Sequence, residues 1–271
     1  MNNDIKKCIY AILYSLLIGI VGMGVPLVSS FLLFGLSGIN TNMVYANNML
    51  MGVIGGPAIY LLTKKYFNKK SKSSEILDVF TQKGIKRSIS GIIVGIALPT
   101  LLFIIIIVCG GNVVLNISIH WISIITSIST FIGMSILEEC IFRGILQSTF
   151  EIYGKFLSII IPTTLFTLMH INLWIEFNLL SLIELFCAGI LFVFIMFAYK
   201  NLTCVIIAHL LYNILSSVFF GIESTEGILK TIMPSTTFNL PGEKVIQSIF
   251  IVVQIILISI FILKNKKSNL A

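Results

Sequence analysis

Long apolar stretches recur along the whole chain, and they decide which folds are open to it. Eight stretches are candidates for membrane helices, which need about 20 apolar residues. They lie near residues 8–36, 44–63, 88–109, 120–152, 156–171, 179–199, 201–221 and 245–263. Only 11% of the 271 residues are charged and 57% are hydrophobic, whereas a soluble domain is about 25% charged. The sequence therefore predicts an all-α, polytopic membrane bundle of about eight transmembrane helices, in a single domain over residues 1–271 that is solvated by the lipid bilayer.

The first apolar stretch follows Lys6 and Lys7 and could be read as a secretory signal peptide. A signal peptide has an apolar core of 7–15 residues and a small-residue cleavage site of the A-x-A type. This stretch is longer and no such site closes it. We therefore expect it to be a retained membrane anchor.

The basic residues are distributed as in a membrane protein and not as in a nucleic-acid groove. Eight of the 18 Lys and Arg lie in one polar linker, residues 64–87. Basic loops stay on the cytoplasmic side, so this linker is expected to be cytoplasmic. Eight spans then place both termini in the cytoplasm and the loops 110–119, 172–178 and 222–244 outside. The expected location is the cell membrane, with multiple passes and no nucleic-acid partner.

Three charged residues interrupt the fourth apolar stretch, where residues 135–146 read SILEECIFRGIL. Charges at membrane depth are costly and usually functional. Glu139 and Arg143 are four positions apart and can pair on one helix face. On the same helix, Glu138 is rotated by about 100° from Glu139, so it needs a partner other than Arg143. In a purely structural alternative, Glu139 and Arg143 form a salt bridge within the helix and the Glu138 side chain extends to the lipid headgroups. Glu138 lies about 20 Å from the cytoplasmic helix end, which is too far for its side chain to reach them.

Candidate partners for Glu138 come from other apolar stretches. Counting along each helix places His170, His209 and Asn213 in the same inner-to-middle layer of the bilayer as Glu138. His209 and Asn213 are four positions apart and share a helix face. His120 falls at an outer helix end and is assigned no role. These four polar groups, on three helices at one depth, predict a single site.

This residue set supports hydrolysis by activated water. A buried carboxylate beside an imidazole can act as a general base, so Glu138 and His170 are candidate water activators. His209 and Asn213 could donate to the oxyanion that forms at a hydrolysed carbonyl. Alternatively, Glu138, His170 and His209 could bind catalytic zinc with water as the fourth ligand. The sequence alone leaves both possibilities open.

The same residues give the chain a family resemblance. EECIFR fits E-E-x-x-x-R, FTLMH fits F-x-x-x-H and so adds Phe166, and HLLYN fits H-x-x-x-N. In this order, on separate membrane helices, the motifs resemble the CAAX protease and bacteriocin-processing family of Rce1-type intramembrane endopeptidases. The likeness covers roughly residues 120–220, the expected catalytic core.

The resemblance implies an eight-helix bundle with a cavity reached from the cytosol, and the catalytic roles given above. Glu139, Arg143 and Phe166 would be supporting residues. The implied substrate is a peptide or a membrane-tethered protein, and bacterial relatives look like processors of pheromones or bacteriocins, or immunity proteins. Both a metal-dependent and a metal-free glutamate mechanism remain compatible with the family.

Two functions of other classes remain as alternatives. A non-catalytic immunity protein could use the polar core to bind a partner. A proton-coupled transporter could use buried Glu and His as a proton relay, although transporters often show inverted repeats and we find none in this sequence.

Overall fold

The structure is a computed structural model that describes residues 3–34, 41–68, 82–171, 178–222 and 227–268. It is 84% helical, which confirms the all-α prediction. Its α-helices are α1 (Asn3–Phe34), α2 (Thr41–Leu50), α3 (Gly56–Asn68), α5 (Gln82–Val108), α6 (Trp121–Glu139), α7 (Ser148–Phe150), α8 (Lys155–Met169), α9 (Leu179–Tyr199), α10 (Leu202–Asn213) and α11 (Gly242–Ser268). Shorter π and 3₁₀ segments join some of them: η1 (Met51–Gly55), η2 (Cys140–Gln147), η3 (Glu151–Tyr153) and η4 (Ile214–Phe219).

Within the described residues, six helical segments are long and apolar enough to cross a membrane: Asp4–Phe34, Gly84–Val108, Trp121–Tyr153, Leu179–Tyr199, Leu202–Phe219 and Gly242–Leu263. The other two predicted spans are also helical. The stretch 44–63 lies in α2 and α3, which are joined by the π-helical segment η1. The stretch 156–171 forms the short apolar helix α8. The chain is thus a multi-pass membrane protein.

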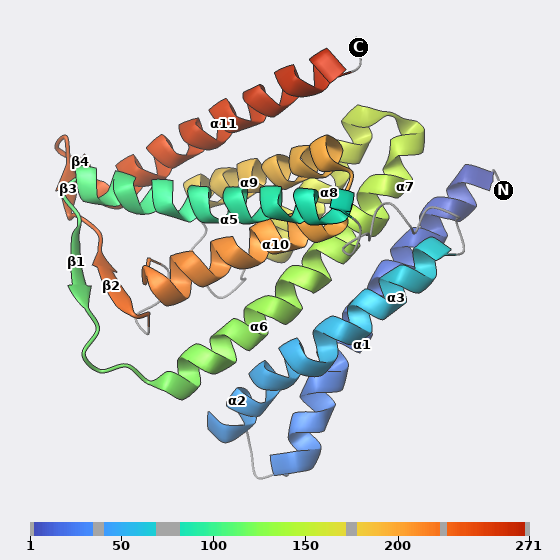
Figure 1. Cartoon of the computed structure of the whole chain (residues 1–271), viewed down its shortest axis with the longest axis horizontal. Helices are drawn as coiled ribbons and strands as arrows, with labels where there is room; N and C mark the ends of the chain where they lie inside the picture. The colour runs from blue at the N-terminus through green and yellow to red at the C-terminus, as the bar shows by residue number, and fades with distance from the viewer. Residues whose placement is uncertain (1–2, 35–40, 69–81, 172–177, 223–226, 269–271) are drawn as a thin grey trace.

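Two short β-ladders were not predicted from the sequence. Strand β1 (Asn112–Leu115) pairs antiparallel with β2 (Leu229–Ile232), and β3 (Thr236–Thr237) pairs with β4 (Leu240–Pro241). The first ladder joins two of the loops expected outside, so these loops lie at the same end of the bundle, as the predicted topology requires. Figure 1 shows the strands at the left, whereas the N-terminus lies at the right and the C-terminus at the top, right of the centre.

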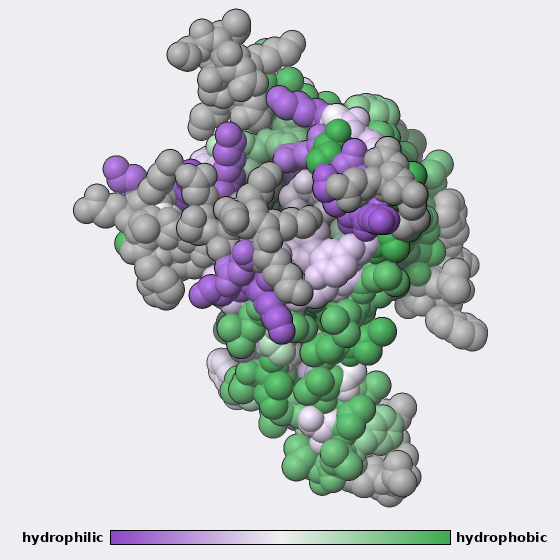
Figure 2. Space-filling view, turned by 90° about the vertical axis from the view of Figure 1, so that its right-hand side faces the viewer, coloured by the Kyte–Doolittle hydropathy of each residue, from purple (hydrophilic) through white to green (hydrophobic). Residues whose placement is uncertain are grey.

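The described flanks of the basic linker lie at the same end of the bundle as the start of α1 and the end of α11. Residues 69–81 of the linker fall outside the described residues, but exposed Lys64 and Lys65 close α3 and Lys86 lies near the start of α5. Figure 2 looks onto this end, where hydrophilic residues gather above an apolar flank. One end of the bundle is therefore polar and basic, and its assignment to the cytoplasm stays a prediction.

Close helix crossings hold the bundle together. Helix α6 crosses η1 so closely that a Cβ built on Gly133 would collide with the backbone of Met51. Helix α5 approaches α10 in the same way, since a Cβ on Gly91 would meet the carbonyl of Cys204. Small residues at such crossings let membrane helices pack backbone to backbone. The two crossings fix α6 and α10, two of the helices that carry the site.

We expect Gly133→Leu to lower the thermal unfolding midpoint in detergent, because overpacking costs about 1–3 kcal/mol. Gly19→Leu is the matched control, since a Cβ at Gly19 has nothing within 4 Å. Scanning fluorimetry of the two variants gives the comparison. Equal midpoints for both would show that the α6–η1 crossing is not tight.

Candidate active site

The helical geometry changes directly after the two acidic residues. Helix α6 ends at Glu139, and the chain continues without a break as the π-helical segment η2, all eight residues of which are buried. π-helical geometry is rare and is frequent at functional sites. The sequence predicts a helix through this stretch but does not predict its π-helical geometry.

Glu139 and Arg143 form the predicted ion pair. Arg143 Nη1 donates to Glu139 Oε1 at 3.1 Å, and both side chains are fully buried. Pulling two charges out of water is costly unless further hydrogen bonds accompany the pair. Further partners for both charges are therefore needed.

The guanidinium of Arg143 finds these partners on α8 and α9. Its Nη2 donates to the carbonyl of Gly189 at 3.1 Å. Its Cζ lies 4.4 Å from the ring centroid of Phe166 and 5.3 Å from that of Phe192, within cation–π range. Arg143 therefore ties η2 to both helices. The contact with the Gly189 carbonyl joins residues 46 positions apart and was not predicted from the sequence.

Glu139 has a second partner that the sequence did not reveal. His209 Nδ1 lies 2.7 Å from Glu139 Oε1, and the imidazole stacks on Phe192 with ring centroids 4.9 Å apart. An ionised carboxylate only accepts hydrogen bonds, so Nδ1 carries the hydrogen. The contact therefore orients the ring and leaves Nε2 for other partners.

His170 is oriented by the backbone at the end of α8. Its backbone N–H donates to the carbonyl of Thr167 at 3.1 Å, and its Nδ1 lies 2.8 Å from the carbonyl oxygen of Phe166. The last carbonyls of a helix have no intrahelical partner, and a carbonyl only accepts, so Nδ1 again carries the hydrogen. The spacing F-x-x-x-H thus puts the Phe166 carbonyl within reach of the imidazole.

Both imidazoles turn their Nε2 atoms toward Glu138. Glu138 Oε2 lies 3.8 Å from His170 Nε2 and 3.9 Å from His209 Nε2. These distances exceed a direct hydrogen bond but suit contact through one water molecule. The structure thus brings together Glu138, His170 and His209 from α6, α8 and α10.

Asn213 is less closely tied to this group. It is the last residue of α10, one turn after His209, and its side chain is partly exposed. Over the part of the chain that the structure describes, no hydrogen bond joins its side chain to Glu138, His170 or His209. Its place in the site stays a prediction.

The donor groups do not form a metal site as they stand. In the described ranges, no three His, Cys, Asp or Glu side chains are grouped closely enough to hold a metal ion. Both Nδ1 atoms do face oxygen acceptors, which is also how metal-binding histidines are oriented, but that feature orients a catalytic imidazole equally well. The described side chains therefore do not provide a ready set of ligands for the zinc alternative.

His120 lies away from the site, in agreement with the sequence analysis. Its Nδ1 is 3.0 Å from Ser123 Oγ and 3.3 Å from Tyr45 Oη. This contact joins the start of α6 to α2, which is a structural role.

A membrane bundle with a buried acid–imidazole group is the arrangement expected of a membrane-embedded hydrolase. Residues 120–215 match the family model described as type II CAAX prenyl endopeptidase Rce1-like. Over this segment the chain is similar to the Rce1-like CAAX-type intramembrane proteases, and the resemblance stated from the sequence is confirmed. The searches of curated proteins and of solved structures found no match.

We expect Arg143→Met to be strongly destabilising, because it leaves the Glu139 carboxylate buried without its cation, a loss of about 3–5 kcal/mol. The double variant Arg143→Met/Glu139→Gln should recover part of this stability, since neither charge then remains. Detergent unfolding of both single variants and the double variant measures the coupling. Additive losses would mean that the two side chains do not depend on each other.

Proposed function

We propose that this protein hydrolyses a peptide bond of a membrane-associated peptide or protein by attack of a water molecule, without a covalent intermediate. The observation that carries the proposal is the approach of two imidazole Nε2 atoms to Glu138 Oε2, at 3.8 and 3.9 Å. The Rce1-like match supports the same class of reaction.

In the proposed first step, Glu138 and His170 activate the water. A water in contact with Glu138 Oε2 and His170 Nε2 loses a proton to this pair as its oxygen attacks the carbonyl carbon of the substrate. A general base must lie within hydrogen-bond reach of the proton it takes, directly or through one water. Glu138 is 8% exposed and His170 is exposed, so the pair is open on the His170 side.

His209 is proposed to stabilise the oxyanion of the tetrahedral intermediate. Its Nδ1 is engaged with Glu139, so a proton on Nε2 makes the ring an imidazolium, which lies between the carboxylates of Glu139 and Glu138. Asn213 is proposed as the second donor. Collapse of the intermediate then breaks the C–N bond, and the proton held by Glu138 and His170 passes to the amine that leaves.

Glu138→Gln and His170→Ala should each abolish cleavage while the protein still accumulates in membranes, because each removes a group that handles the proton of the water. The measurement is peptide mass spectrometry of membranes that contain the wild type or a variant, which detects the products and identifies the substrate.

Glu184→Gln is the matched control, since Glu184 is a partly buried acid on α9 that the mechanism does not use. It should leave the products in place. Wild-type product levels in both Glu138→Gln and His170→Ala would refute the proposed function.

We also expect cleavage to survive the removal of divalent metal ions, because the mechanism uses only protein side chains and water. Purified protein is treated with a chelator and then assayed with and without added Zn²⁺. A loss of activity that Zn²⁺ restores would favour the zinc alternative.

A further inference from the structure

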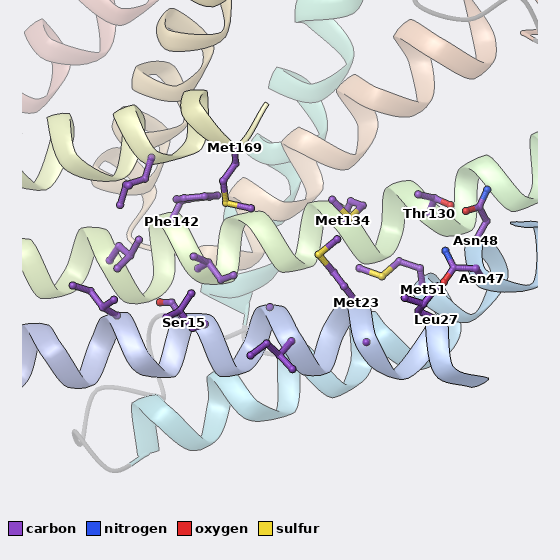
Figure 3. Close-up of a pocket in the computed structure, with 18 residues that line it drawn as sticks. Ser15, Met23, Leu27, Asn47, Asn48, Met51, Thr130, Met134, Phe142 and Met169 are labelled. Carbon is purple, nitrogen blue, oxygen red and sulfur yellow. The ribbon is translucent and has the colours of Figure 1, made fainter. Parts of the chain in front are cut away.

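An elongated groove of about 790 Å³ runs beside the candidate site. Helix α1 forms one wall, joined by the end of α2 and η1, and α8 forms the other wall. Helix α6 and η2 form the floor (Figure 3). Its lining on α1 extends from Ile12 to Leu27, about 22 Å at 1.5 Å per residue.

The groove is open toward the lipid. Its α1 wall includes Leu16 and Ile20, which are 59% and 70% exposed, and its α8 wall includes Met169, which is 62% exposed. Two glycines of α1 widen it, because a Cβ built on Gly19 or Gly24 meets nothing within 4 Å. A molecule in the bilayer can therefore enter from the side.

The floor and one wall of the groove lead to the site. Met134 and Ile141 line the floor about one turn before and after Glu138. Met169, which points into the groove in Figure 3, directly precedes His170. Glu138 and His170 do not line the groove themselves, but an occupant would pass the side chains of Met134, Ile141 and Met169 that flank them in the chain.

Polar groups in the groove are few, and this limits what can bind there. An extended peptide about 22 Å long has about seven residues, hence about 14 backbone donors and acceptors. The groove offers four polar side chains, Ser15, Asn47, Asn48 and Thr130, and Thr130 already donates to the carbonyl of Thr126. In lipid, backbone groups without a partner are costly, so an extended peptide would not fill the whole groove.

We propose that the half of the groove between Asn47 and Glu138 binds an apolar peptide helix of the substrate, and that the chain unwinds beside Glu138 and His170. This inference rests on the proposed function. A helix satisfies its own backbone and can lay one apolar face into a groove that is open to lipid. Only the segment at the scissile bond then needs polar partners, and the site supplies them.

The two asparagines support a peptide occupant. They point into the groove in Figure 3. Among the residues that the structure describes, neither side chain has a hydrogen-bond partner. A helix end carries unpaired N–H and C=O groups, and an amide side chain can both donate to and accept from them. Asn47 and Asn48 are thus assigned to the end of the bound helix.

The probe is a synthetic Leu/Ala peptide of about 20 apolar residues, flanked by lysines and carrying a photo-cross-linker at its centre. The full-length protein is reconstituted in vesicles of phosphatidylcholine and phosphatidylglycerol. We expect Gly19→Trp and Gly24→Trp each to lower cross-linking about tenfold, because the indole fills space that the helix would occupy. Asn47→Leu/Asn48→Leu should also lower it.

Leu13→Trp is the control, since Leu13 is on the same helix and 60% exposed but does not line the groove. Equal cross-linking in the control and in both glycine variants would overturn the inference. In a parallel arm, the probe is a phosphatidylcholine with a photoactivatable acyl chain. If the glycine variants displace this lipid and not the peptide, the groove is a lipid site and the inference is wrong.

Binding does not require hydrolysis, so cross-linking is repeated in Glu138→Gln. Groove-dependent cross-linking without any product formed by the wild type would refute the proposed function alone. Product formation at the wild-type rate by both glycine variants would refute the docking inference alone.

Discussion

The buried guanidinium of Arg143 is the group on which the geometry of the site depends. It pairs with Glu139, which binds His209 Nδ1, and it lies over the ring of Phe166, whose carbonyl receives His170 Nδ1. A single cation thus supports the orientation of both imidazoles. A fully buried ion pair stabilises a fold weakly at best, because desolvation offsets the Coulomb attraction. Its value here is that it sets the direction of two rings.

The two adjacent acids, Glu138 and Glu139, have different surroundings. Glu139 is fully buried, and its Oε1 is shared by Arg143 and His209. Glu138 is slightly exposed, and its ion-pair partners among the described residues are His170 and His209, at 3.8 and 3.9 Å. The first carboxylate therefore holds the structure together, whereas Oε2 of the second is buried without a hydrogen-bond partner among the described residues, as suits the role of water activator that we propose for it. Both acids are at the end of α6, just before the π-helical segment η2, so the same helix end positions both carboxylates.

The features that could be predicted from the sequence are those that depend on local spacing or on composition. Apolar stretches gave the helices, and the four-residue spacing gave the pairing of Glu139 with Arg143. Counting residues from helix ends placed Glu138, His170 and His209 at one depth, and the structure brings them together. The contact between Glu139 and His209 joins residues 70 positions apart, so no local pattern contains it.

The features that could not be predicted depend on tertiary packing. The π-helical geometry of η2 arises in a segment whose sequence is also compatible with an α-helix. The strand pairing of β1 with β2 links residues that are 114 to 120 positions apart in the sequence, from Leu115–Leu229 to Asn112–Ile232. For Asn213, sharing a helix face with His209 was not sufficient to bring its side chain into hydrogen-bond contact with the acid–imidazole group.

The most direct test of the central claim is the protonation of the imidazole of His209. With three histidines in the chain, nitrogen-15 labelling of histidine and solid-state NMR in bilayers can resolve each ring. We predict that His209 carries a hydrogen on Nδ1 that is strongly bonded to oxygen, and that Glu139→Gln changes this signal more than Glu138→Gln does. A His209 ring with an unprotonated Nδ1 in the wild-type protein would rule out the arrangement of Arg143, Glu139 and His209 described above.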